Sequence, residues 1–330
     1  MYSRIVTSSA LIASLSIGVE SAAALDCGKA DDAVSKVICA SPDLVKADVA
    51  LNEAWKGAQH GLIPRERERL LQNQKDWLST RDSCVKFPKT PPAQCLAQTM
   101  ALRTRFLAAI PGTPATSRLT IVTEDPSEAK NPGGSLYLML FRFAEPRNEA
   151  ERLFNAQVDA SASSARGEVT SSGEACGSCE ANAGMATPLI TSDFISAPVE
   201  QSSYTGGAHG GGWTDVINID LKKQRLSQAG DWFEGAGLKD VMRMCLKEVQ
   251  AQVKESKAED MDRSIDGSGQ PSDTFKKAFS DISFWTFTGT SIDVNFPTET
   301  FNVYSAGSQG CKLSYENVTP KLKAGAVLPR

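Results

Sequence analysis

The chain has 330 residues, of which 41% are hydrophobic, 7% aromatic and 22% charged. This composition supports a buried core and excludes a disordered protein, and the length exceeds that of one typical domain, which predicts two domains. The formal net charge of −4 gives no electrostatic reason to bind nucleic acid or anionic lipid, and it favours a basic partner.

Residues 1–24 have the features of an export signal. Arg4 provides a positive start, a mostly apolar stretch runs from Ala10 to Val19, and Ala22 to Ala24 offer the small residues of a cleavage site. Cleavage there would make Leu25 the first residue of the mature chain. The apolar stretch is shorter than the roughly 20 residues that span a bilayer, and no later segment approaches that length, so we expect no transmembrane helix.

The cysteines indicate the compartment. All of them follow the predicted cleavage point, at Cys27, Cys39, Cys84, Cys95, Cys176, Cys179, Cys245 and Cys311. An even number of cysteines in an exported protein predicts disulfide bonds, whereas free thiols or metal ligands suit a reducing compartment. Asp26 precedes Cys27 where a lipoprotein signal has a small residue, so we expect no lipid anchor. The periplasm is the predicted location.

Residues 25–110 are predicted to form a small helical bundle. Apolar side chains recur every three or four residues in the stretches 44–58, 70–81 and 96–107. Ser41 and Pro42 are typical of the N-cap and first turn of a helix. Trp77 and Arg81 share the apolar stripe of the second stretch, so we expect both in the bundle interior, with Arg81 near a carboxylate such as Asp48.

Two disulfide pairings are possible in this bundle. Helices joined by short loops run antiparallel, which brings the start of the Pro42 helix near the end of the helix that closes at Cys84. This geometry favours Cys39 with Cys84 and Cys27 with Cys95. The alternative is the local pairing of Cys27 with Cys39 and of Cys84 with Cys95.

The rest of the chain is predicted to be a linker and an α+β domain. Residues 111–133 are rich in proline and small polar residues, as in a linker, with one short strand at 119–123. Residues 134–330 mix strand and helix patterns without a regular βαβ alternation, which predicts a mostly antiparallel sheet with packed helices. The clearest patterns are strands at 135–143, 216–227, 281–289, 291–297 and 310–318, and helices at 148–162 and 237–255.

The cysteines of this second domain predict further disulfides. Cys176 and Cys179 are separated by two residues, Gly and Ser, in a segment rich in glycine and serine, without the strand-to-helix context of a redox site or the four ligands of a zinc site. A local disulfide is the favoured interpretation. Cys245, on the predicted helix, and Cys311, on a terminal strand, would then join those two elements. We expect no metal site and no cofactor.

The first domain resembles a known family. Three segments carry the likeness, namely "DCGKADDAVSKVICASPDLVKADVALNEAW", "QKDWLSTRDSC" and "QCLAQTMALRTRFL". Together they are similar to the LprI-type lysozyme-inhibitor domain. Trp55 departs from that pattern, since another aromatic residue, often tyrosine, is usual there. The resemblance implies lysozyme inhibition.

The second domain resembles another family. The segments "SSYTGGAHGGGWTDVINIDLKKQRLSQAGDWF" and "FWTFTGTSIDVNFPTETFNVYSAGSQGCKLSYENVTPKL" are similar to the C-terminal domain of the lysozyme-sensing extracytoplasmic anti-sigma factor. The same domain occurs in some peptidoglycan deacetylases, whose catalysis lies in a separate domain that nothing here resembles. In the sensor the domain plugs the substrate cleft of lysozyme. The resemblance therefore implies a binding domain.

The segment "YTGGAHGGGW" is the candidate contact with that partner. Its glycines suit a tight turn or a close approach of the backbone, and they lack the spacing of a phosphate-binding loop. His209 has no recognisable nucleophile motif beside it, which favours a structural role within the turn. The predicted partner-binding residues are Tyr204, Gly206, Gly207, His209 and Trp213, with Trp232 as a weaker candidate.

The sequence therefore predicts a periplasmic protein that binds and inhibits lysozyme, or a related basic glycan hydrolase, by occluding its cleft. It predicts no enzymatic activity. The alternative is a cell-envelope enzyme that acts on peptidoglycan through His209 with Asp215 or Asp220. A third interpretation is an envelope scaffold whose two binding modules hold another partner.

Overall fold

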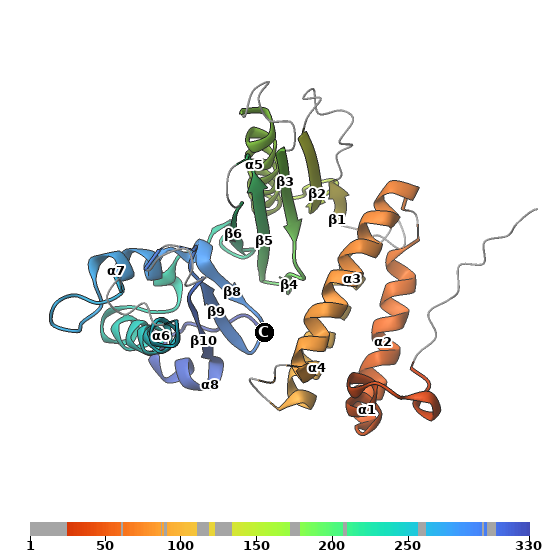
Figure 1. Cartoon of the computed structure of the whole chain (residues 1–330), viewed down its shortest axis with the longest axis horizontal. Coiled ribbons are helices and arrows are strands. Elements are labelled where there is room, and N and C mark those ends of the chain that lie inside the picture. The colour runs from red at the N-terminus through yellow and green to blue at the C-terminus, as the bar shows by residue number, and fades with distance from the viewer. Residues whose placement is uncertain are drawn as a thin grey trace, which may run out of the picture.

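A computed structural model describes residues 25–60, 62–86, 88, 91–110, 119–122, 134–171, 179–206, 210–256, 262–298, 300–301 and 308–330. Within these ranges, a group of helices precedes a mixed region of strands and helices (Figure 1). This arrangement confirms the predicted α+β class. None of the helices in these ranges is long and apolar enough to cross a membrane.

The N-terminal helices begin where the sequence provides caps. They are α1 (Ala33–Cys39), α2 (Pro42–Ala58), α3 (Pro64–Lys86) and α4 (Pro92–Ala109), with a 3₁₀ turn at Cys27–Lys29. Asp32 accepts from the first backbone amides of α1, and Ser41 does the same for α2, which offsets the missing hydrogen bonds of a helix start. The three predicted stretches correspond to α2, α3 and α4, whereas α1 was not predicted.

The favoured disulfide pairing of this region is wrong. Cys27 is bonded to Cys39, with 5.5 Å between their Cα atoms, and Cys84 is bonded to Cys95, with 5.6 Å. The prediction assumed that α2 packs beside the next helix along the chain. Instead α2 packs mainly against α4. Each of these cysteines is therefore bonded to the cysteine nearest to it in the sequence, as in the alternative pairing.

The interior of the bundle is only partly as predicted. Trp77 is buried, with 6% of its surface exposed. Arg81 instead pairs with the adjacent Asp82, at 2.7 Å between Nη2 and Oδ1. Asp48 accepts hydrogen bonds from the backbone nitrogen of Leu25 and from the Asn52 side chain. The predicted Arg81–Asp48 contact is therefore wrong.

The main sheet follows the helices. Among the described residues, seven strands form it: β1 (Leu119–Val122), β2 (Gly134–Phe143), β3 (Cys179–Met185), β4 (Leu189–Ile190), β5 (Phe194–Tyr204), β6 (Gly211–Asp220) and β7 (Arg225–Leu226). The order is β1-β2-β3-β5-β6-β7, and β4 pairs with β5. Only β2 and β3 pair in parallel among these strands, because α5 (Glu149–Ser171) connects them. The predicted strand near residue 119 belongs to this sheet.

A second, smaller sheet lies near the C-terminus. It contains β8 (Trp285–Phe287), β9 (Ser291–Asn295) and β10 (Gly310–Ser314), all antiparallel. The helices around it are α6 (Gly235–Glu255), α7 (Asp273–Ser280) and α8 (Tyr315–Val318), with 3₁₀ turns at Ala229–Asp231, Ile282–Phe284 and Thr319–Lys321. The Cys245–Cys311 disulfide joins α6 to β10, as predicted. Cys179 is also disulfide-bonded, whereas Cys176 lies outside the described residues.

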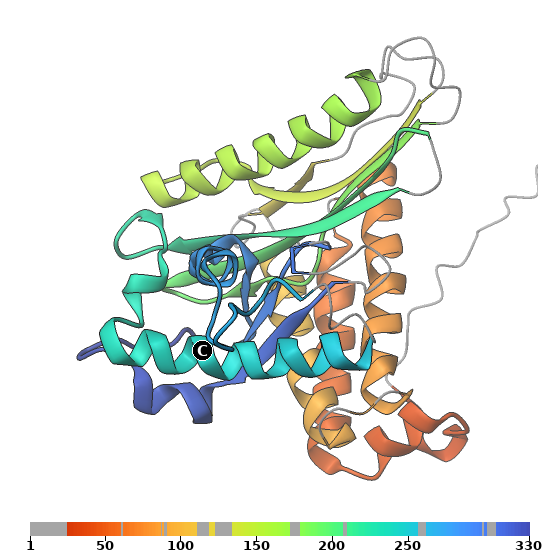
Figure 2. The same ribbon diagram turned by 60° about the vertical axis from the view of Figure 1, so that its left-hand side comes forward.

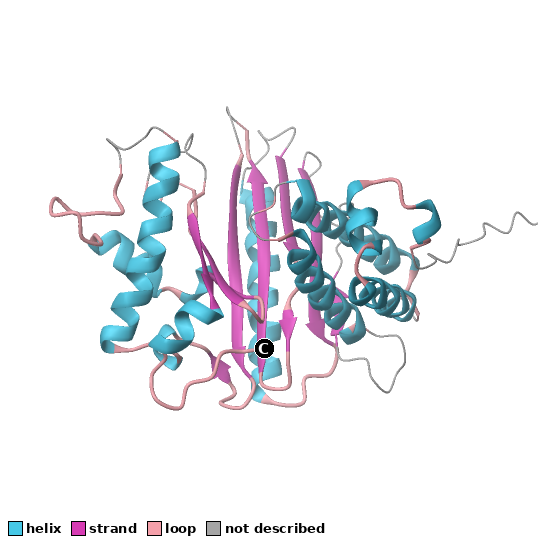
Figure 3. Cartoon of the chain, turned by 90° about the horizontal axis from the view of Figure 1, so that it is seen from below, coloured by secondary structure: helices cyan, strands magenta, loops and turns pink. Residues whose placement is uncertain are grey.

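The main sheet is covered on both faces. Helix α5 lies along one face (Figures 2 and 3). The N-terminal helices and the C-terminal unit, which consists of α6 to α8 and β8 to β10, share the opposite face. Phe106 of α4 meets Phe141 of β2 edge to face, with ring centres 4.5 Å apart. At the other end of that face, the Asn218 side chain donates to the carbonyl of Trp285 at 2.8 Å.

Two apolar cores result from this packing. One includes side chains from α1 to α5 together with β2, β3, β5 and β6. The other lies among α6, α7 and β8 to β10. The N-terminal helices therefore share a continuous core with the main sheet. The domain boundaries drawn from the sequence stay predictions.

Candidate binding site

The β5–β6 hairpin carries the described part of the predicted contact segment. The two strands pair from Phe194 opposite Asp220 to Ser203 opposite Gly211. At the end of the hairpin, Gly206 and Gly211 are exposed, and Tyr204 is half-buried. Gly207 and His209 lie outside the described residues, so their predicted roles stay predictions. The flanks of the segment are open to a partner molecule.

Two glycines of this hairpin end have a physical reason to be glycine. Gly206 has a φ of +98°, which favours a residue without a side chain. A Cβ atom at Gly210 would lie 2.7 Å from the carbonyl oxygen of Ser203. The close approach of the two backbones therefore depends on the absence of a side chain at Gly210. These glycines fix the geometry with which the hairpin ends.

Trp213 lies next to this end on β6 and is tied into the sheet. Its indole nitrogen donates to Asp215 Oδ2 at 3.1 Å, and Gln201 Nε2 donates to the same oxygen at 3.0 Å. Burial raises the pKa of Asp215, and these two hydrogen bonds oppose the rise. Trp213 is half-buried, so part of its ring remains available. Its indole N–H is already hydrogen-bonded to Asp215.

The two carboxylates of the alternative enzyme interpretation lie apart. Asp215 is occupied by Gln201 and Trp213, as above. Asp220 accepts from the backbone nitrogens of Lys222 and Lys223, at 3.0 Å and 2.8 Å, and so caps the turn after β6. Five residues of an extended strand separate the two by roughly 16 Å and place them on opposite faces. The alternative pairs His209 with only one of them, and His209 lies outside the described residues, so that interpretation stays a prediction.

Trp232 is not a surface residue. Only 5% of it is exposed, and its indole nitrogen donates to the carbonyl of Val327 at 3.1 Å. Its ring lies against Phe287, with 4.6 Å between ring centres. The prediction of a partner contact at Trp232 is therefore wrong. The C-terminal segment covers this side chain, and nothing in the local sequence indicates that.

A cleft runs along the face of the main sheet that lies between the N-terminal helices and the C-terminal unit. Two adjoining hollows form it, with volumes of about 480 Å³ and about 340 Å³. Both are lined by Tyr137, Gly184 and Glu200 of the sheet. The first extends toward Trp213 and the segment 295–297, and the second extends toward α3 and α4. The hairpin end and the cleft are therefore contiguous.

The charges in this cleft were not predicted. Part of the Glu200 side chain remains in contact with solvent, and the cleft walls surround the rest. This partial burial, together with the nearby Asp76, raises the pKa of Glu200. The Arg69 guanidinium lies over the Tyr137 ring, 4.3 Å from its centre, and burial raises the pKa of Tyr137. The one available sequence signal was a glutamate within the apolar strand segment "FISAPVE". Its neighbours come from distant segments.

Arg103 lies in the wall of the cleft, between the helices and the sheet. It is fully buried and donates to Gln74, Asn73 and Thr187, which belong to α3 and to the segment after β3. Burial lowers the pKa of Arg103 to about 9. Its Nη2 atom and the indole nitrogen of Trp77 have no hydrogen-bond partner within the described structure. Arg103 therefore joins three segments that are far apart in the sequence.

No group of three or more His, Cys, Asp or Glu side chains in the described ranges is placed to hold an ion.

One known family is similar to the helical region. The family "Lysozyme inhibitor LprI" matches residues 27–107, which contain α1 to α3, most of α4 and both local disulfides. No functionally curated protein matches the chain. The segment 27–107 is therefore similar to a family of lysozyme inhibitors.

Two solved structures of DUF3298 family proteins are similar to the chain. The one from Bacteroides fragilis has 16% identity and a TM-score of 0.42, covering 62% of this chain and 92% of its own. The one from Pseudomonas aeruginosa has 14% identity and a TM-score of 0.43, covering 64% of this chain and 97% of its own. Likeness at this level carries no argument about function. The resemblance to the anti-sigma factor domain stays a prediction.

Proposed function

We propose that this protein is exported to the periplasm, where it binds lysozyme-like glycan hydrolases and inhibits them by occluding the substrate cleft. The observation that carries the proposal is the match of residues 27–107 to a lysozyme-inhibitor family. The disulfides of the structure support an oxidising compartment outside the cytoplasm. The protein acts as a binding partner and makes or breaks no covalent bond.

The hairpin end is the proposed inserting element. Its exposed glycines present bare backbone donors and acceptors, and Tyr204 and Trp213 flank them. A narrow segment of this kind fits a groove that side chains would obstruct. Lysozyme carries two carboxylates in its cleft, which backbone amides can meet. The net charge of −4 on this chain attracts a basic hydrolase as a whole.

Inhibition and binding of lysozyme by the purified protein test the proposal. We expect loss of glycan hydrolysis at stoichiometric protein, and an affinity that falls as salt rises, since opposite net charges are screened. Tyr204→Ala should weaken binding about tenfold or more, as truncation of an aromatic anchor does. Lys222→Ala, in the exposed turn at the other end of β6, is the matched control and should change nothing.

The helical region provides a second arm of this experiment. Two large apolar residues are exposed here. Ile63, just before α3, has 53% of its surface exposed, and Leu71, on α3, has 46%. If Ile63→Asp or Leu71→Asp weakens binding and Tyr204→Ala does not, the helices contact the hydrolase and the proposed role of the hairpin is wrong. Absence of binding to any lysozyme-like hydrolase would overturn the proposed function itself.

A further inference from the structure

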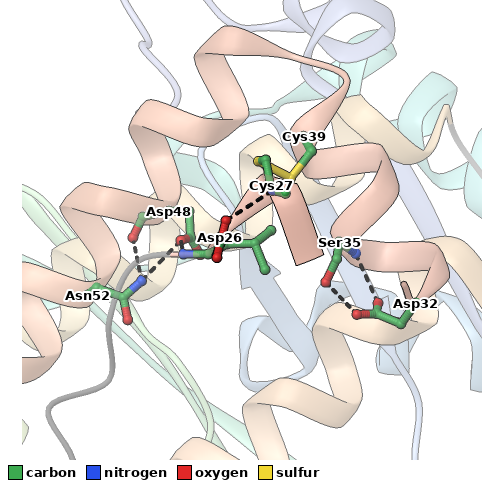
Figure 4. The surroundings of a disulfide bond; sticks show 9 residues. Asp26, Cys27, Asp32, Ser35, Cys39, Asp48 and Asn52 are labelled. Atoms are coloured by element: carbon green, nitrogen blue, oxygen red, sulfur yellow. Dashed lines mark hydrogen bonds between the residues drawn. A yellow bond between two sulfur atoms is a disulfide. The ribbon is translucent and has the colours of Figure 1, made fainter. Parts of the chain in front are cut away.

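Asp48 is a buried carboxylate without a basic side chain beside it. It lies on α2 with 8% of its surface exposed, and no Lys or Arg of the described ranges forms an ion pair with it. Its Oδ2 atom accepts from Asn52 Nδ2 at 3.1 Å (Figure 4). The same atom accepts from the backbone nitrogen of Leu25 at 2.9 Å. Buried carboxylates are costly unless a cation or several hydrogen bonds compensate them.

The position of the Leu25 nitrogen is held from both sides. The Leu25 side chain packs against the apolar core that the N-terminal helices share with the sheet. Two residues later, the disulfide of Cys27 to Cys39 fixes the chain to the end of α1. The nitrogen is therefore held beside Asp48 by packing and by a covalent bond.

The sequence predicts that this same nitrogen becomes the amino terminus, because the small-residue cleavage site ends at Ala24. We propose that cleavage between Ala24 and Leu25 turns a backbone hydrogen bond into an ion pair between the new α-ammonium group and Asp48. Removal of the export signal would then complete the charge balance of the helical region. The inference rests on the proposed export and is independent of lysozyme binding.

The chemistry of this step is hydrolysis of one peptide bond by an endopeptidase that removes export signals. The C–N bond between Ala24 and Leu25 breaks, and water supplies the oxygen of the new Ala24 carboxylate. The Leu25 nitrogen takes up protons to become an ammonium group. An α-amino group in water titrates at about pH 8, so it is largely charged at neutral pH.

The geometry selects one cleavage position. A cut one residue later would remove both the nitrogen that Asp48 holds and the side chain that the core holds. A cut one residue earlier would leave the Leu25 nitrogen as a neutral amide, with the charge one residue, about 3.8 Å between Cα atoms, further away. The ion pair with Asp48 forms directly only when the chain starts at Leu25.

The experiment compares full-length mature proteins that differ at their first residue. One starts at Leu25 and the other at Ala24, each made as a fusion from which a protease leaves no extra residue, and each with Asp48 or Asp48→Asn. Urea unfolding at pH 6.5 should give a folding equilibrium constant about five- to thirtyfold larger for the Leu25 form. In the Asp48→Asn background, the two forms should be equally stable.

The pH dependence gives an independent readout. An ion pair raises the titration point of the amine in the folded protein above that in the unfolded chain. Its stabilisation is therefore complete below about pH 8 and is lost as the pH rises through the folded titration point. The difference between the Leu25 and Ala24 forms should shrink at high pH. Asp32→Asn, at the exposed cap of α1, is the control and should affect both forms equally.

Three outcomes would overturn the inference. One is equal stability of the Leu25 and Ala24 forms with Asp48 intact, a comparison that needs no side-chain variant to fold. Another is a loss of stability on Asp48→Asn that is equally large in the Leu25 form and the Ala24 form. The third is an intact mass of the exported protein that corresponds to another first residue. Failure to bind lysozyme would bear on the proposed function only.

Discussion

The Asn73 side chain on α3 donates a hydrogen bond to the carbonyl of Met185 on β3, at 3.2 Å. Its own oxygen accepts from Arg103 Nη1 at 2.6 Å, and Arg103 also reaches Thr187 at 3.3 Å. The Asn73–Arg103 contact joins α3 to α4, and the contacts with Met185 and Thr187 connect these helices to β3 and the segment after it, beside an apolar core that helices and sheet share. A buried polar network of this kind couples the stability of the two regions.

We expect Asn73→Ala to destabilise the whole chain by about 1–3 kcal/mol. The substitution leaves the Met185 carbonyl and one Arg103 donor without their partner in a buried place. Because the core is shared, calorimetry should show helices and sheet losing structure in the same transition. Gln72→Ala is the control, since Gln72 is exposed and its side chain donates to Asp76 within the same helix. Loss of the helices alone, with an unchanged sheet, would contradict the coupling.

The disulfides should differ in what they contribute to stability. Cys245 and Cys311 are 66 residues apart in the sequence, whereas Cys27 and Cys39 are 12 apart. Closing the longer loop removes more entropy from the unfolded chain. Loss of the Cys245–Cys311 disulfide should therefore lower the free energy of unfolding by about 4 kcal/mol, and loss of the Cys27–Cys39 disulfide by about 3 kcal/mol. Denaturant titration of the two double alanine variants measures the difference. A larger cost for Cys27–Cys39 would show that native-state effects outweigh loop entropy.

Asp231 should make stability fall in acid. Burial alone would raise its pKa, but hydrogen bonds from Arg225, Lys223 and the Gln228 amide prevail and lower it to about 2. A lowered carboxylate pKa stabilises the fold above the unfolded value, and the gain is lost as the pH falls toward 2. Asp231→Asn should therefore destabilise the protein by about 1–3 kcal/mol at pH 7.

The cost of the same substitution should shrink as the pH falls from 4 through 2, because Asp231 is then protonated first in the unfolded chain and, around pH 2, in the folded protein as well. Asp266→Asn is a useful comparison, because the hydrogen bonds that lower the pKa of that exposed carboxyl come from its own turn. A cost of Asp231→Asn that does not change with pH would exclude the charge as its cause.

The charge of Glu200 should destabilise the fold at neutral pH, whereas that of Asp231 stabilises it. Burial in the cleft, with Asp76 nearby, raises the pKa of Glu200, so the ionised form disfavours the folded state at neutral pH. Glu200→Gln should stabilise the protein at pH 7 by about 0.2–1 kcal/mol, the range for exposed charge interactions. The gain should vanish as the pH falls below the unfolded value near 4.5. Glu180→Gln on the neighbouring strand is the control, and a stability loss at Glu200 would contradict the assignment.

Local patterns predicted much of the secondary structure. Apolar spacing placed α2, α3, α4 and α6 and the burial of Trp77, and Ser41 marked the start of α2. Once the helix of Cys245 and the strand of Cys311 were recognised, their disulfide followed as well. These features depend on residues three or four apart along one helix, or on a cap and its own first turn.

The sequence by itself determined the α+β class, the caps and the apolar faces of the helices, because these depend on backbone periodicity and near neighbours. Only the tertiary structure decided that Cys27 bonds to Cys39, that Arg81 pairs with Asp82, that Trp232 is covered, and that Glu200 and Asp76 line the same cleft. Each of these depends on which faces pack together, and the free energy of that choice is spread over contacts between segments far apart in the chain.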